Sequence, residues 1–135
     1  MTIGLARATP LRGQSTAADI MEKLGSALDT FNIFHNQVLV AIFIRPEKTA
    51  GGIFLADQTI GEDVYQGKCG LVLKKGPLAF KNDERNDFGG CDVEVGDWAV
   101  FRVSDGFSLK INGVMCRLLE DVHVKAVTPD PLTVY

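Results

Sequence analysis

The stretch GDWAVFRVSDGFSLKINGVMCRLL, residues 96–119, decides the fold class of this chain. It contains the apolar-rich segments WAVFRV, FSLKI and VMCRLL, which are separated only by Ser104-Asp105-Gly106 and Asn112-Gly113. Asp-Gly and Asn-Gly tolerate the positive φ angles that tight hairpin turns require. The stretch therefore predicts consecutive antiparallel strands joined by short turns.

Further strands are expected on both sides of this stretch. The run VLVAIFI, residues 38–44, is rich in β-branched and aromatic residues, as in a strand with both faces covered. Arg45-Pro46 ends it, because proline cannot continue a hydrogen-bonded ladder. KCGLVLKK at 68–75 and VHVKAV at 122–127 are the other expected strands. Many short strands with frequent turns predict a small all-β barrel.

One helix is expected before the barrel. Thr16 is a suitable N-cap, and Ile20, Leu24 and Leu28 follow at i, i+4 and i+8 as one apolar stripe. Gly25 weakens the helix, so a helix of about 13 residues needs a docking surface to persist.

Both ends of the chain have the composition of arms. The first 14 residues carry arginines, glycines and a proline without apolar periodicity, and the last residues are DPLTVY. We therefore expect an N-terminal arm and helix over 1–32, a barrel over 33–127 and a C-terminal tail over 128–135.

Composition excludes several classes of partner. A chain of 135 residues is long enough for one domain. A net charge of −3 argues against nucleic acid, which requires a basic face. The longest apolar run, 38–44, is far shorter than the ~20 residues of a bilayer span, and no secretion signal is visible. We expect a cytoplasmic protein with neither membrane nor nucleic acid as partner.

The residues that carry chemistry do not form an enzyme motif. Cys69, Cys91 and Cys116 are odd in number and lack Cys-x-x-Cys spacing, which indicates packed thiols in a reducing compartment. Only His35 and His123 are available to join them, so no metal site is predicted. Nucleophile, phosphate-binding and dinucleotide-binding motifs are missing. We expect no catalytic activity and no cofactor.

The segment KTAGGIFLADQ contains an apolar triplet in a region otherwise rich in turn formers and charge. Gly51 and Gly52 precede Ile53, Phe54 and Leu55. The triplet is either a short barrel strand or an element that binds a groove of another protein. Its burial yields about 5–8 kcal/mol, most of which is consumed by ordering a flexible segment. One such segment binds weakly, whereas several on one oligomer act together.

Five segments together resemble the co-chaperonin family (GroES-like, chaperonin-10) over roughly residues 33–127. In chain order they are FHNQVLV, KTAGGIFL, QGKCGLVLKKGP, VEVGDWAVF and EDVHVKAV. The second is close to the mobile-loop signature of that family, and the fourth contains its Val-Gly-Asp turn. The order and spacing make the resemblance specific, although Gly-Gly-Ile-x-Leu alone is a weak signal.

The resemblance implies a function for the apolar triplet. Co-chaperonins are seven-fold rings of GroES-like β-barrels that bind the apical domains of a chaperonin ring and assist ATP-dependent protein folding. By this resemblance, residues 46–65 are the mobile loop and residues 76–91 a roof-type loop. The partner-binding residues are then Gly51, Gly52, Ile53, Phe54 and Leu55.

The resemblance also implies where copies of the chain meet. In the family, the first and last strands lie at the interface between subunits of the ring. The corresponding interface residues are His35, Gln37, Val38, Val124 and Val127. Asn36-Gln37 replaces the family's Asp-Arg, and Lys74 stands where glycine is usual.

The front of the chain leaves a second hypothesis open. About 30 residues precede the barrel, whereas typical family members start near the first strand. Virus-encoded co-chaperonins vary in such regions, so a viral origin is also open. The alternative function is a virion structural protein, a capsid decoration or cement subunit on a GroES-like barrel. Its partner would be a capsid protein and its location the virion.

Overall fold

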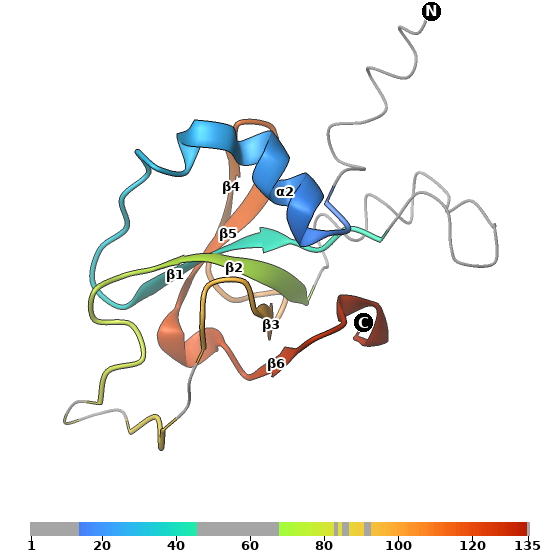
Figure 1. Ribbon diagram of the computed structural model, residues 1–135. Helices are drawn as coiled ribbons and strands as arrows, with labels where there is room; N and C mark the ends of the chain where they lie inside the picture. The colour runs from blue at the N-terminus through green and yellow to red at the C-terminus, as the bar shows by residue number, and fades with distance from the viewer. Residues whose placement is uncertain (1–13, 46–67, 83, 85–86, 91–92, 135) are drawn as a thin grey trace, which may run out of the picture.

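The computed structural model describes residues 14–45, 68–82, 84, 87–90 and 93–134. Six antiparallel strands of this part form one sheet in the order β4-β5-β1-β2-β3-β6 (Figure 1). They are β1 (Gln37–Ile42), β2 (Cys69–Lys75), β3 (Trp98–Val100), β4 (Phe107–Ile111), β5 (Val114–Glu120) and β6 (Ala126–Thr128). The all-β prediction is confirmed.

The sheet curls around an interior cluster of apolar side chains. Val38, Val40 and Ile42 of β1 share this cluster with Ala99 of β3 and Leu119 of β5. Strands β5 and β3 are separated by β1 and β2 in the sheet, so the sheet must curve to bring their side chains together. The result is a small β-barrel with a filled interior.

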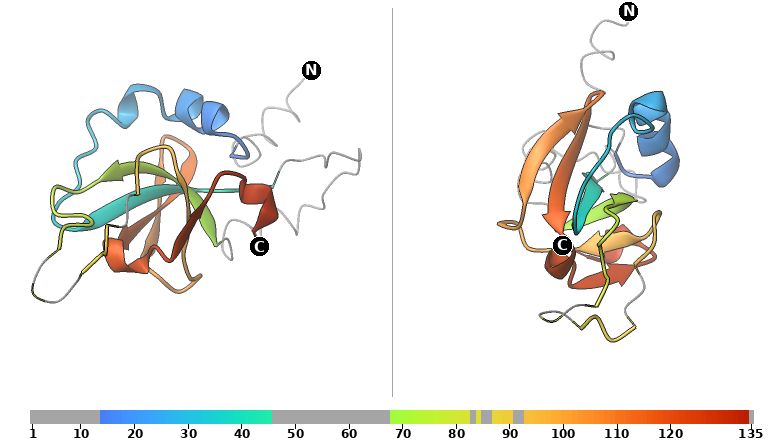
Figure 2. Two further views of the ribbon diagram at one scale, coloured as in Figure 1. Left: turned by 60° about the horizontal axis from the view of Figure 1, so that its bottom comes forward. Right: turned by 90° about the vertical axis from the view of Figure 1, so that its left-hand side faces the viewer.

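A second apolar cluster lies on the outer face of the sheet. Leu39, Ala41 and Phe43 point to this face, where Ile20 and Leu24 of helix α2 (Ala17–Leu24) pack on them. Figure 2 shows α2 lying along the outside of the sheet. Strand β1 is therefore buried on both faces, as its continuous apolar sequence predicts.

Helix α2 is shorter than predicted. Thr16 is its N-cap and accepts a hydrogen bond from the Asp19 amide at 3.1 Å, as expected. The helix ends after eight residues at Gly25, where φ is 53°, and the 3-10 turn η1 (Gly25–Ala27) follows. Glycine adopts this left-handed conformation without steric penalty, so Gly25 terminates the helix rather than merely weakening it.

The hairpin predicted at Asn112-Gly113 is confirmed, since β4 pairs with β5. The hairpin predicted at Ser104-Asp105-Gly106 is wrong, because in the described sheet β3 pairs with β2 and β6 and not with β4. Asn112 and Gly113 have φ angles of 50° and 83°, and Gly106 has 65°. The Asn112 side chain also donates a hydrogen bond to the Lys23 carbonyl at 2.8 Å. The tip of the β4–β5 hairpin thus caps the C-terminal end of α2, which joins the helix to the barrel.

Strand β3 ends at Val100, three residues earlier than predicted. The chain turns because the Arg102 amide donates to the Asp105 carboxylate at 3.2 Å. Arg117 reaches the same turn from β5 and donates to the carbonyls of Val103 and Asp105, at 2.6 and 3.0 Å. These contacts form a turn at residues 102–105, after the Phe101 amide.

The prediction of one strand over residues 122–127 is wrong. The chain first forms the 3-10 turn η2 (Asp121–His123) and only then strand β6. The Glu120 amide donates to His123 Nδ1 at 3.0 Å, which closes the turn. The alternating sequence is compatible with a strand, but side-chain contacts of Asp121 and His123 favour a bend.

The C-terminal residues after β6 form a further 3-10 turn, η3 (Pro131–Thr133), with Pro131 buried. Asp130 caps this turn by accepting from the Leu132 amide at 3.0 Å. The predicted N-terminal arm lies outside the described residues except for Gln14. Among the helices of the described part, none has the length and apolar character needed to cross a membrane.

Candidate functional site

The predicted partner-binding residues Gly51, Gly52, Ile53, Phe54 and Leu55 lie outside the described residues. The chain on both sides of them is described. We call residues 42–45 and 68–69 the loop base, because they flank residues 46–67 in the sequence.

The loop base is held by backbone hydrogen bonds. The Phe43 amide donates to the Cys69 carbonyl at 2.9 Å, which extends the β1–β2 ladder beyond Ile42. The Phe101 amide donates to the Lys68 carbonyl, also at 2.9 Å. Both sides of the loop base therefore belong to the barrel.

Gln14 reaches the loop base from the N-terminal side. Its side chain is fully buried and donates to the carbonyls of Ile42 and Met115, at 2.8 and 3.0 Å. Its side-chain oxygen accepts from the Met115 amide at 2.8 Å, and its backbone carbonyl accepts from the Ile44 amide at 3.0 Å. No local sequence pattern distinguishes this glutamine, so the sequence analysis missed it.

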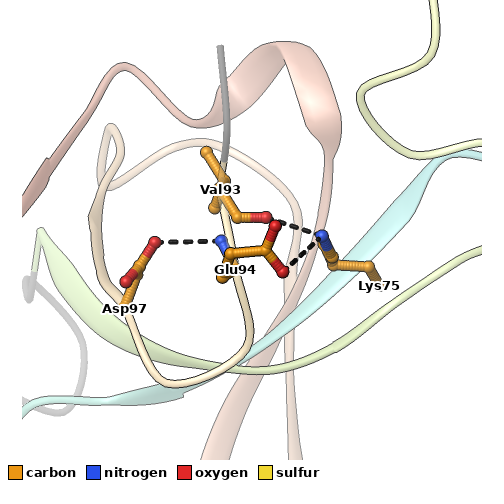
Figure 3. A network of polar contacts seen from close by, with 4 residues as sticks. All are labelled: Lys75, Val93, Glu94 and Asp97. Atoms are coloured by element: carbon orange, nitrogen blue, oxygen red, sulfur yellow. Dashed lines mark hydrogen bonds and ion pairs between the residues drawn. The ribbon is translucent and has the colours of Figure 1, made fainter.

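A second set of contacts closes the base of the roof-type loop, residues 76–91. Lys75 donates to the Val93 carbonyl at 2.7 Å and lies 3.4 Å from a Glu94 carboxylate oxygen (Figure 3). The Glu94 amide donates to the Asp97 carboxylate at 2.9 Å, which holds the turn in place. Lys75 and Val93 flank the loop, so their hydrogen bond joins its two ends.

The start of the roof-type loop also packs against the chain before β1. The Gly76 amide donates to the Gln37 carbonyl at 2.7 Å, and the Leu78 amide donates to the His35 carbonyl at 3.0 Å. A Cβ at position 76 would collide with the His35 carbonyl and lie 3.0 Å from the Phe34 carbonyl. Glycine is required here by close approach of two backbones.

Asp121 connects three segments at the same end of the barrel. It is 2% exposed, and its carboxylate accepts from the Asn36 side chain and from the Phe80 amide, each at 3.0 Å. Its own amide donates to the Asn36 carbonyl at 3.0 Å. Asn36 stands where the family has aspartate, and its side-chain amide donates to Asp121, which an aspartate could not do.

Lys74, which stands where glycine is usual in the family, donates to the Phe31 carbonyl at 2.7 Å.

Two of the predicted interface residues lie at the barrel surface where β1 begins. His35 is exposed and has a φ angle of 58°, and Gln37 is half-buried. Phe34 beside them is 66% exposed. Leu78, whose amide is bonded to the His35 carbonyl, is 58% exposed. This surface combines exposed apolar side chains with polar ones.

Two other predicted interface residues face inward. Val38 is fully buried in the interior cluster, and Val124 is half-buried against it. Strand β1 is also paired on both sides, with β2 and β5. The side chain of Val38 therefore packs in the interior cluster, and its part in a contact between copies stays a prediction.

Val127 lies on β6, an edge strand that pairs only with β3 in the described sheet. Its side chain is 47% exposed. A hollow of about 320 Å³ adjoins the strand. It is lined by Gly96, Asp97, Trp98, Val127, Thr128 and Pro129.

Three side chains considered as metal ligands in the sequence, Cys69, Cys116 and His123, lie within the described part. Burial raises the pKa of the Cys69 and Cys116 thiols to about 12, which keeps both protonated at neutral pH. His123 accepts the hydrogen bond that closes η2. Within the described ranges, no group of three His, Cys, Asp or Glu side chains is placed to hold a metal ion.

The two buried thiols are expected to resist thiol reagents. We expect a Cys91→Ser variant, which retains only these two, to show no reaction with a disulfide-exchange reagent at pH 8 while folded. At that pH a thiol of pKa about 12 is ionised to only about one part in ten thousand. Addition of denaturant should release both thiols. Rapid reaction of the folded variant would contradict their burial.

Arg117 is a further residue that the sequence analysis missed. It is 5% exposed, and its guanidinium lies 5.7 Å from the centre of the Phe101 ring. Among the described residues its Nε has no hydrogen-bond partner. Burial lowers its pKa, while nearby Asp105 opposes this effect. A single arginine inside the otherwise apolar run VMCRLL, residues 114–119, was the only available signal.

The described residues define a class of protein: a small β-barrel in which the ends of residues 46–67 and of residues 76–91 are fixed near opposite ends of β1. Residues 30–128 match the sequence family described as the chaperonin 10 Kd subunit. The chain therefore belongs to the chaperonin 10 kDa (GroES-like co-chaperonin) family, and its role is that of a co-chaperonin.

Relatives of known name support the same assignment. The chain is 33% identical to Co-chaperonin GroES 2 of Mesorhizobium japonicum over 105 residues, which cover 78% of this chain and 95% of that protein. It is 32% identical to Co-chaperonin GroES of Trichlorobacter lovleyi over 96 residues, covering 69% and 91%. The identity to Co-chaperonin GroES of Pelagibacter ubique is 31% over 98 residues, covering 73% and 96%. None of these findings supports the alternative of a virion structural protein.

Proposed function

We propose that this protein acts in the cytoplasm as a homo-oligomeric lid for a chaperonin ring, which it binds through Ile53, Phe54 and Leu55. It assists ATP-dependent folding without catalysing a reaction itself. The observation that carries this proposal is the family match over residues 30–128, which includes the Gly-Gly-Ile-Phe-Leu sequence.

The described residues support this proposal through the way the loop base is built. Residues 46–67 start and end at adjacent strands, because the Phe43 amide is bonded to the Cys69 carbonyl. A long segment between adjacent strands of a barrel can present apolar side chains outside the barrel core. The barrel interior is already filled by its own cluster, so the triplet is not needed to complete it.

Oligomerisation follows from the weakness of a single loop. Burial of three apolar side chains is largely offset by the ordering of the segment, so one copy binds weakly. A ring presents several loops at once, and each bound loop raises the effective concentration of the others. We propose a heptamer in which the surface of His35 and Gln37 on one copy approaches the β6 edge, with Val127, of the next.

The test is capture of a chaperonin ring in the presence of nucleotide by wild type and by Phe54→Asp. We expect the variant to lose capture, because seven buried charges cannot be accommodated in apolar grooves. Gln58→Asp is the matched control, since it introduces the same charge outside the apolar triplet and should be captured like wild type. Native mass spectrometry should show the same copy number for all three proteins. Equal capture of wild type and Phe54→Asp would exclude the proposed binding mode.

A further inference from the structure

The end of strand β1 has different partners on its two sides. On one side β2 continues the ladder, and the Phe43 amide donates to the Cys69 carbonyl. On the other side β5 pairs with β1 only as far as Ala41 opposite Cys116. Beyond that point, the polar backbone groups of Ile42 and Ile44 on this side are bonded to Gln14.

The Gln14 side chain takes the place of a peptide group between the two strands. Its amide nitrogen donates to Ile42 of β1 and to Met115 of β5, and its oxygen accepts from the Met115 amide. All three hydrogen bonds are between 2.8 and 3.0 Å long, and the side chain is fully buried. A primary amide is the only side-chain group that provides this donor and acceptor set in uncharged form.

The backbone of Gln14 makes a fourth hydrogen bond, two residues beyond Ile42 in the chain. Its carbonyl accepts from the Ile44 amide at 3.0 Å. Ile44 is itself fully buried in the interior cluster, two residues before the segment that contains the apolar triplet. Gln14 thus holds the chain just after β1 against the barrel on the side where β5 no longer reaches.

We propose that Gln14 is a positioning residue for partner binding: it fixes the strand end at Ile42–Ile44 from which the chain continues into the partner-binding segment. This inference rests on the proposed function and assigns it a residue outside the family match, which begins at residue 30. Gln14 does not touch the partner. It acts through the backbone of Ile42 and Ile44.

The physical reason is the effective concentration of the loops. In a ring, several loops bind more tightly than one only if each loop begins at a position from which it reaches its binding groove. A strand end that frays by several residues lengthens the tether and adds conformations that must be lost on binding. This entropy cost is added for every loop of the ring. A small increase in each copy therefore becomes a large decrease in the affinity of the complete ring.

The test compares the affinity of full-length rings for a nucleotide-loaded chaperonin. Gln14→Met keeps the volume of the side chain and removes its three hydrogen bonds. Leu119→Ala is the matched control, because it opens a cavity in the same interior cluster beside Val38, at the opposite end of β1. Rings of both variants are first shown to be folded and of wild-type copy number. We expect Gln14→Met to bind about tenfold or more weakly, and Leu119→Ala to bind within about twofold of wild type.

A second readout separates positioning from general destabilisation. Hydrogen exchange of the Ile44 amide should accelerate in Gln14→Met far more than exchange of the Val72 amide in β2, whereas Leu119→Ala should not single out Ile44. If Gln14→Met does not fold, Gln14→Asn, whose shorter amide cannot span both strands, takes its place in the same measurements. Equal weakening by the Gln14 and Leu119 variants, or none by either, would overturn the inference.

The two proposals fail in different ways. If Phe54→Asp is captured like wild type, the proposed partner-binding mode fails whatever Gln14 does. If Phe54→Asp loses capture while the Gln14 variant binds like wild type, only the positioning role of Gln14 is excluded.

Discussion

Replacement of Gln14 by glutamate is expected to reduce the free energy of unfolding by about 3 kcal/mol or more at pH 8. The substitution preserves the shape of the side chain. It replaces the amide nitrogen, which donates to the carbonyls of Ile42 and Met115, with an oxygen that cannot donate. A carboxylate there would face two carbonyl oxygens without a donor between them. The site is fully buried, so water does not compensate for the lost hydrogen bonds.

The same variant should show a pH dependence that wild type lacks. Burial beside two carbonyl oxygens would raise the pKa of the introduced carboxyl group in the folded state above its unfolded value of about 4.3. Between these two values the unfolded chain releases a proton that the folded chain retains, so stability falls as pH rises. We expect the difference from wild type to be smallest near pH 4 and largest above the folded-state pKa.

Denaturant unfolding at several pH values measures this effect. Gln14→Met serves as the control, because it loses the same hydrogen bonds without introducing a titratable group. Its deficit relative to wild type should stay constant with pH. A constant deficit for Gln14→Glu as well would show that residue 14 is solvated and not inserted between β1 and β5.

Gly106→Ala is expected to cost about 2–5 kcal/mol of folding free energy, the sum of about 1–2 kcal/mol of backbone strain and about 1–3 kcal/mol of steric overlap. Gly106 has a φ of 65°, which alanine adopts with a penalty of roughly 1–2 kcal/mol. In addition, its Cβ would collide with the Leu118 carbonyl and lie 2.8 Å from Leu119 Cδ2. The carbonyl is part of the β5 backbone and cannot move without disturbing the sheet.

Gly113→Ala separates these two contributions. Gly113 has a φ of 83°, but a Cβ there would meet nothing within 4 Å. We expect a loss of only about 1–2 kcal/mol, from backbone strain alone. Thermal or denaturant unfolding of both variants gives the comparison. Similar losses at the two positions would mean that the close approach of Gly106 to β5 is not maintained in solution.

The hairpin region was predictable because its determinants are local. Asn112-Gly113 and Asp105-Gly106 favour positive φ, and strands β4 and β5 begin and end within one residue of the expected positions. Helix α2 was predictable for a similar reason, since the spacing of Ile20 and Leu24 requires an apolar surface. Its length was overestimated because Gly25 was treated as a weak helix residue instead of a terminator.

The error after β5 has a tertiary cause. Alternation in VHVKAV favours a strand. However, the Asp121 carboxylate is buried because it accepts hydrogen bonds from the Asn36 side chain and the Phe80 amide, which lie 85 and 41 residues away in the chain. The candidate interface shows the same limit. Val38 and Gln37 are neighbours on β1, so alternation alone places their side chains on opposite faces of the sheet. Only the tertiary structure decides which of these faces becomes the filled interior.

By itself, the sequence determined the all-β class, the turns of the β4–β5 hairpin, the apolar stripe of α2 and the membership in the co-chaperonin family. Each of these depends on residues close together in the chain or on a motif in a set order. Only the tertiary structure decided that Gln14 is buried and that Asp121 joins three segments. A polar side chain is buried at low cost only where it finds hydrogen-bond partners. The partners of Gln14 are the carbonyls of Ile42 and Met115, which lie 28 and 101 residues away in the chain.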